Sequence, residues 1–196
     1  MESMVRSLRF ALFALVLPLA GQAQLVVTNT QTPAWLVQNI LLGQGLSVSN
    51  ITFNGAPATV VTEQAGEVDA TNTVLGMGQG LILATGDVNH ALGPNNSGSS
   101  SLGGGNMGQT DPDLEILANP QSVNDAAVLE FDFVPTGDSL KFDFVFASDE
   151  YLEFVNSVND IFGFFLSGPG ISGPFSNNSA NIALIPNTTD PVAINT

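Results

Sequence analysis

The stretch from Asn124 to Gly170, NDAAVLEFDFVPTGDSLKFDFVFASDEYLEFVNSVNDIFGFFLSGPG, decides the fold that the sequence predicts. Apolar residues alternate with other residues over 127–134 and again over 140–146, which is the period of strands with one buried face. Residues 135–138 (PTGD) lie between these runs and contain the proline and glycine that turns favour. This stretch therefore predicts an antiparallel β-hairpin.

The length of the turn sets the register of the predicted hairpin. Counting outward from it pairs Asp132 with Lys141, and Glu130 with Asp143. The first pair is attractive, whereas two opposed carboxylates repel each other unless they are solvated or share a cation. We favour a solvated acidic face over a cation site, because exposed charge pairs contribute little to stability.

A third segment, residues 160–166 (DIFGFFL), is apolar on both faces. Such a run is typical of a strand that is buried between two layers. Together with the hairpin, it predicts an all-β fold, an antiparallel β-sandwich or jelly-roll-like domain.

The sequence also predicts one short N-terminal helix packed on the sheets. Thr32 and Pro33 supply an N-cap and a first helical position, and Gly43 follows the predicted end. Trp35 is interpreted as a packing residue, with an exposed ligand-stacking ring as the alternative. The apolar stripe that would face the sheet consists of Leu36, Val37, Ile40 and Leu41.

Residues 46–53 (LSVSNITF) alternate before Asn54-Gly55, which predicts a strand, a tight turn and a partner strand at 59–62. The long loop over 86–110 is rich in glycine and serine, and we interpret it as a flexible surface loop, with ligand contact as the alternative. The other predicted elements are strands at 25–28, 80–86, 182–186 and 192–194 and a short helix at 111–117.

The N-terminus carries an export signal. Arg6 and Arg9 precede an apolar run, and a small-x-small pattern ends at Ala23, which predicts a signal peptide over 1–23. The run is too short to span a bilayer as a helix. We therefore expect a secreted or cell-surface domain over 24–196, without a membrane span. Because the chain stops inside a predicted strand, we also expect this domain to be truncated at its C-terminus.

The charge of the chain excludes two classes of partner. Its formal net charge is −15, and Lys141 is its only Lys or Arg outside the predicted signal peptide. Binding to nucleic acid or to anionic lipid needs clustered basic residues. The absence of cysteine also excludes disulfides and cysteine-ligated metals, so packing must hold the exported fold together, helped at most by a cation.

Three segments, read together, resemble the choice-of-anchor L domain family of exported bacterial proteins. They are LVQNILLGQGLSVSNITFNG (36–55), GLILATGDVNHALGPNNSG (80–98) and the longer run from NDAAVLEFDF to FLSGPGISGPF (124–175). The resemblance implies an extracellular or surface module whose relatives end in varying C-terminal anchors. It implies no agreed enzymatic activity, transfers no catalytic residue and identifies no ligand.

The best candidate site is the acidic segment over 148–160. Calcium takes six to eight oxygen ligands from carboxylates, amide carbonyls and the backbone, and the candidate calcium ligands are Asp149, Glu150, Asn159 and Asp160. The spacing is not that of an EF-hand. We therefore favour acids that cap turns and stay solvated, and keep the calcium site as the alternative.

Catalysis finds little support in the residues. A glycosidase needs two carboxylates across a cleft, whereas neighbours such as Asp149 and Glu150 point to opposite faces of an extended chain. His90 is the only histidine, and no G-x-S-x-G motif is present. We predict a non-catalytic surface module for adhesion or for binding a glycan or protein, with stabilisation by calcium as the alternative already given for its acidic segment. The alternatives are a structural spacer in a large surface protein and a polysaccharide-acting hydrolase with paired carboxylates.

Overall fold

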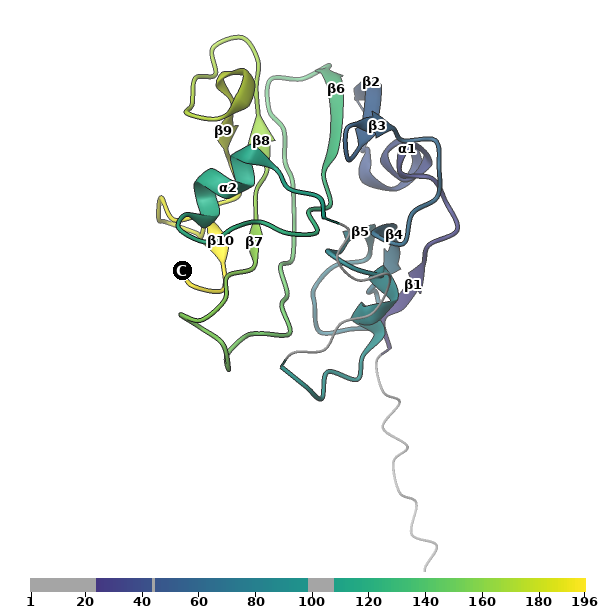
Figure 1. Ribbon diagram of the computed structural model, residues 1–196. Helices are drawn as coiled ribbons and strands as arrows, with labels where there is room; N and C mark the ends of the chain where they lie inside the picture. Colours follow the sequence, from purple (N-terminus) through teal and green to yellow (C-terminus); the bar gives the residue numbers. More distant parts are fainter. Residues whose placement is uncertain (1–23, 44, 99–107) are drawn as a thin grey trace, which may run out of the picture.

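A computed structural model of the chain describes residues 24–43, 45–98 and 108–196. These residues form mostly short strands in antiparallel sheets, with few helices (Figure 1), which confirms the all-β class. Each sheet in the described ranges has only two or three strands, so the sandwich architecture is not established. The predicted signal peptide and residues 99–107 of the predicted loop lie outside the described residues.

The first sheet lies in the N-terminal half. It contains β1 (Val26–Thr28), β4 (Ala65–Asp69) and β5 (Gln79–Leu83), in the order β1-β4-β5. The strands predicted at 25–28 and 80–86 are confirmed. The sequence AGEVD of β4 has no apolar alternation that would predict a strand, and pairing with a neighbour on each side defines it.

The second sheet has the order β3-β2-β6. Its central strand β2 (Leu46–Phe53) was predicted, and so was the turn that follows it. Asn54 and Gly55 have φ angles of 48° and 73°, the left-handed conformation that a two-residue hairpin turn requires. The partner predicted at 59–62 is wrong, because the turn is so tight that β3 (Ala56–Pro57) already pairs with β2.

The predicted hairpin is also wrong, although its first strand forms as β6 (Leu129–Pro135). β6 pairs with β2, which places Asp132 opposite Ser49 and Glu130 opposite Thr52. The physical reason lies in the acids. β2 offers donors, since Asn50 Nδ2 lies 2.6 Å from Asp132 Oδ2 and Thr52 Oγ1 lies 3.4 Å from Glu130 Oε2. The predicted hairpin would instead have set Glu130 against a second carboxylate.

Residues 137–148, here called the connecting segment, form no strand. No backbone–backbone hydrogen bond joins them to another described residue. Lys141, predicted to pair with Asp132, lies 3.0 Å from Asp143 of its own segment.

The N-terminal helix is confirmed. Thr32 Oγ1 accepts a hydrogen bond from the backbone N–H of Trp35 at 3.2 Å, and α1 (Pro33–Leu36) continues as the π-helical η1 (Val37–Leu41). Trp35 lies at the surface, 36% exposed. The main core forms where the helix meets the two sheets, and its buried members are Leu36, Phe53, Ala58 and Ala65.

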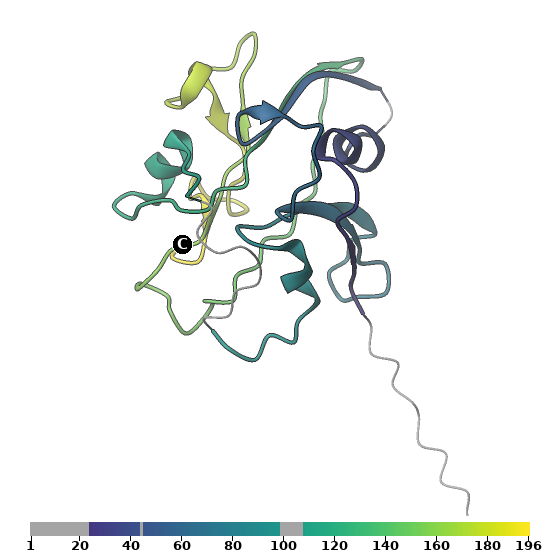
Figure 2. The same ribbon diagram turned by 45° about the vertical axis from the view of Figure 1, so that its right-hand side comes forward.

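The C-terminal half has smaller elements on the other side of β6, and the two views agree on this arrangement (Figures 1 and 2). The predicted helix forms as α2 (Pro112–Ala118), where Asp111 Oδ1 caps the first turn by accepting from two backbone N–H groups. The remaining helical turns are η2 (Val88–Leu92) and η3 (Ser176–Asn178).

The single strand predicted over 160–166 is divided into two. β7 (Ile161–Phe162) pairs with β10 (Val192–Ala193), whereas β8 (Phe165–Leu166) pairs with β9 (Ala180–Asn181). The strand predicted at 192–194 therefore forms. The one predicted at 182–186 is wrong, because the chain pairs just before it and Leu184 makes only an isolated bridge with Pro191.

Gln64 connects the two halves from inside the core, where it is 1% exposed. Its Nε2 donates to the carbonyl oxygens of Thr85 at 3.3 Å and Asp125 at 3.0 Å. Its Oε1 accepts from Asn54 Nδ2 at 3.1 Å. Three segments far apart in the sequence are thereby held by one amide.

We expect Gln64→Ala to destabilise the domain by about 2–4 kcal/mol. The substitution leaves the polar groups that bind the Gln64 amide without a hydrogen-bond partner, and it creates a cavity. Urea unfolding measures the change. The matched control is Gln38→Ala, at an exposed helical position, which should stay within about 0.5 kcal/mol of the wild type. Equal effects of the two substitutions would contradict the role given to Gln64.

Candidate functional site

The acidic segment gathers around one hydroxyl group. Ser148 Oγ lies 2.5 Å from Asp160 Oδ2 and 3.0 Å from Glu150 Oε2, and it accepts from the backbone N–H of Glu150 at 3.1 Å. A serine hydroxyl has a single proton to donate. Two carboxylates therefore meet at this point with too few donors between them.

The shortage of donors changes the protonation of Glu150. Its pKa is raised above the ordinary value by a hydrogen bond with Asp160, by burial and by the negative charge of Asp160, while the hydrogen bond from Ser148 acts in the opposite direction. Two carboxylates in contact favour sharing a proton. A bound cation would relieve the same repulsion.

The other two predicted ligands are placed differently. Asp149 Oδ2 contacts His90 Nε2 of η2, so the chain brings Glu150 and Asp160 together at Ser148 and engages Asp149 elsewhere. Asn159 Oδ1 is buried and has no hydrogen-bond partner among the described residues. Within the same ranges, no group of three or more His, Cys, Asp and Glu residues could hold a metal ion.

A polar hollow of about 300 Å³ lies where the loop after η2 meets the acidic segment. Tyr151 at its rim is 58% exposed. The hollow is lined by Asn95, Asn96, Ser97, Gly98, Asp149, Tyr151 and Glu153. It combines side-chain amides, two carboxylates and an accessible aromatic ring.

Sequence reasoning found the two halves of this hollow separately and did not connect them. The loop over 86–110 has ligand contact as its alternative interpretation, and the acidic segment is interpreted as solvated turn acids, with a calcium site and a pair of catalytic carboxylates as the alternatives. The sequence pattern does not identify His90 or Tyr151 as part of a binding site. The available signal was one exposed aromatic residue among acids, next to a loop too long for a connection.

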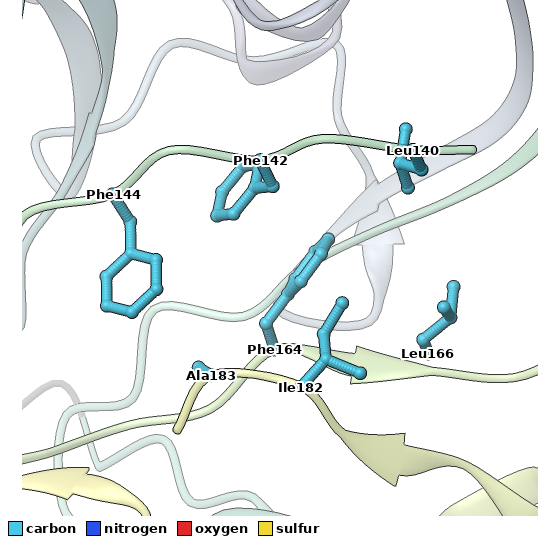
Figure 3. Close-up of a pocket in the computed structure, with 7 residues that line it drawn as sticks. All are labelled: Leu140, Phe142, Phe144, Phe164, Leu166, Ile182 and Ala183. Carbon is cyan, nitrogen blue, oxygen red and sulfur yellow. The ribbon is translucent and has the colours of Figure 1, made fainter. Parts of the chain in front are cut away.

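An apolar groove of about 230 Å³ lies beside the connecting segment (Figure 3). The rings of Phe142 and Phe164 stack there with centroids 4.5 Å apart. The connecting segment and the C-terminal half each contribute exposed side chains, such as Leu140 and Ile182. The groove is lined by Leu140, Phe142, Phe144, Phe164, Leu166, Ile182 and Ala183. Aromatic packing, rather than backbone hydrogen bonds between paired strands, therefore holds the connecting segment against the C-terminal half.

The comparisons with known proteins identify the class of this domain. The family model of the Choice-of-anchor L domain matches residues 25–196, so the chain belongs to that family, as the resemblance implied. No curated protein and no solved structure matches the chain. The family indicates a surface-associated, non-catalytic module. Among the described residues, no helix is long and apolar enough to cross a membrane.

The raised pKa of Glu150 predicts a pH-dependent effect on stability. The folded state holds this proton more tightly than the unfolded state, so the contribution of Glu150 to stability falls as pH rises from the ordinary glutamate value through the raised folded pKa. We expect Glu150→Gln, which keeps an acceptor for Ser148 and adds a donor for Asp160, to raise the melting temperature at pH 7 in chelator.

The gain should disappear below about pH 4, where the glutamate is protonated in both states. Thermal unfolding across this pH range measures it, with Asp138→Asn at an exposed turn as the control that removes the same charge. A lower melting temperature for Glu150→Gln at pH 7 would contradict the description of the carboxylate pair.

Proposed function

We propose that this domain is a non-catalytic module of the cell surface that binds a glycan in the polar hollow. The single observation that carries the proposal is the composition of the hollow, where amides and carboxylates surround the exposed ring of Tyr151. Membership of the Choice-of-anchor L family supports the surface location. The predicted signal peptide over 1–23 supplies the export route.

The chemistry of a sugar fits these groups. Sugar hydroxyls both donate and accept hydrogen bonds, and asparagine amides offer both kinds of partner while carboxylates accept. An exposed tyrosine presents an apolar face for the carbon side of a sugar ring together with a polar hydroxyl. The volume lies at the lower end of the range for small-molecule pockets, about 300–1,000 Å³, so a short glycan segment suits it better than a large ligand.

We further propose that calcium stabilises the acidic segment through Glu150 and Asp160. The support is their meeting at Ser148 with too few donors, together with the unpartnered Oδ1 of Asn159. A divalent cation would replace the shared proton, and backbone oxygens and water would complete its coordination. The two-layer sandwich predicted from the sequence belongs with these proposals as the architecture of the complete domain.

Glycan binding gives the first test. We expect the protein to bind a subset of a glycan array, and Tyr151→Ala to weaken that binding about tenfold in calorimetry, because an aromatic ring that stacks on a ligand commonly contributes more than about 1 kcal/mol. The matched control is Leu152→Ala. This neighbour is 65% exposed but does not line the hollow, so its loss should leave the affinity unchanged.

Two outcomes would replace the proposal. If no glycan binds, the domain is better explained as a structural spacer. If a bound oligosaccharide is cleaved, and Glu153→Gln stops product release, the module is a hydrolase with paired carboxylates.

Calcium gives the second test. A ligand at 100 times its dissociation constant adds about 2.7 kcal/mol to the free energy of unfolding, so calcium should raise the melting temperature above its value in chelator. Asp160→Ala should abolish the rise, whereas Asp138→Ala in the exposed turn should retain it. If calcium does not change the melting temperature, the calcium site is ruled out, and Glu150 and Asp160 are explained as a pair that shares a proton.

A further inference from the structure

We propose that the polar hollow selects sugars that carry a protonated primary amine, the hexosamine class, over neutral and acidic sugars. This inference rests on the proposed glycan-binding function and adds the charge of the ligand. Its basis is the sign of every charged group around the hollow.

The lining contains two carboxylates and no Lys or Arg. Asp149 and Glu153 both face the hollow. Lys141, the only Lys or Arg in the described residues, lies 3.0 Å from Asp143 and outside the lining. His90 is the one other group able to carry a positive charge there, and it already contacts Asp149. A uronic acid or a phosphorylated sugar would bring a third negative charge next to the carboxylates of Asp149 and Glu153.

An amine, by contrast, has partners of two kinds. An ammonium group donates charge-assisted hydrogen bonds to a carboxylate, which are about twice as strong as neutral ones. The ring of Tyr151 offers its face to a cation. An acetylated amine is neutral and bulkier: its single amide N–H can still donate to a carboxylate, but it brings no positive charge to the carboxylates or to the ring.

The Asp149 carboxylate is held in place by a contact with His90. His90 Nε2 contacts Asp149 Oδ2, which sets the orientation of the carboxylate and leaves Oδ1 as its second acceptor. The carboxylate is also partly shielded, with its side chain 21% exposed. Partial burial strengthens its attraction to a cation relative to a fully solvated acid. Asn95 and Asn96 then remain for the sugar hydroxyls.

The net charge acts in the same direction over a longer range. The formal charge of the whole chain is −15. A field of this sign raises the local concentration of cationic ligands and repels anionic ones. Added salt screens this long-range attraction, so the contribution of the hollow itself is best measured at physiological ionic strength.

The test compares oligosaccharides that differ only at the amine. Calorimetric titration of the purified protein would use glucosamine tetramer, N-acetylglucosamine tetramer and a tetramer of a uronic acid. We expect the free amine to bind about tenfold more tightly than the acetylated sugar, and the uronic acid not to bind.

Glu153→Gln should lower the affinity for the glucosamine tetramer more than the affinity for the acetylated tetramer, so that the ratio of the two affinities measured on this variant falls. Asp138→Asn removes the same charge from a residue outside the lining and should keep the preference. Tetralysine is a further arm, since it supplies amines without a sugar ring.

The outcomes separate the two proposals. Equal or tighter binding of the acetylated tetramer, or binding of the uronic acid, overturns this inference and leaves glycan binding in place. Failure of all three sugars overturns this inference, whereas the proposed function is overturned only if no glycan of the array binds. Tetralysine binding as tight as that of glucosamine tetramer, and insensitive to Tyr151→Ala, also overturns the inference, because charge alone would then explain the selectivity.

Discussion

The pairing of β2 with β6 is the contact on which the rest of the structure depends. It joins residues 46–53 to residues 129–135, and one pair of side chains secures its end. The backbone N–H of Asn54 donates to Val128 O, Asn54 Oδ1 accepts from the N–H of Val128, and Gln64 binds the Asn54 amide. A buried polar network with every member satisfied stabilises one arrangement over its alternatives. Loss of these contacts would weaken the connection between the first sheet and the segment around Asp125.

This pairing also determines where the candidate site lies. β6 pairs with β2 along one edge, and the connecting segment makes no backbone hydrogen bond to the other edge among the described residues but packs on the C-terminal half. Phenylalanine rings hold it there, with Phe144 and Phe162 at 5.1 Å in addition to the stacked pair in the groove. Its end delivers Ser148 to Asp160 and turns Asp149 toward η2. The hollow and the carboxylate pair are therefore consequences of a strand that does not form.

The carboxylates of this segment have different environments although they are close in sequence. Glu150 shares its surroundings with a second acid, which raises its pKa. Asp149 is held by an imidazole, and Glu153 faces the hollow at the surface. A chain with so few basic residues cannot neutralise these groups from within. Protons, a divalent cation and cationic ligands are the remaining sources of positive charge. The proposed calcium site and the proposed preference for amino sugars both follow from this scarcity of basic residues.

The sequence by itself determined the local features of this protein. The β2 alternation, the Asn54-Gly55 turn, the Thr32 and Asp111 helix caps and the family resemblance were all readable, because each depends on neighbouring residues. Tertiary structure alone decided which strands pair, where the run over 160–166 divides and which acids meet. Residues 140–146 alternate as a strand should, yet β6 pairs with β2, whose Asn50 lies 82 positions before Asp132 in the sequence, and not with them. A one-dimensional pattern cannot rank such distant partners, because the hydrogen bonds and desolvation that separate them exist only after the chain has folded.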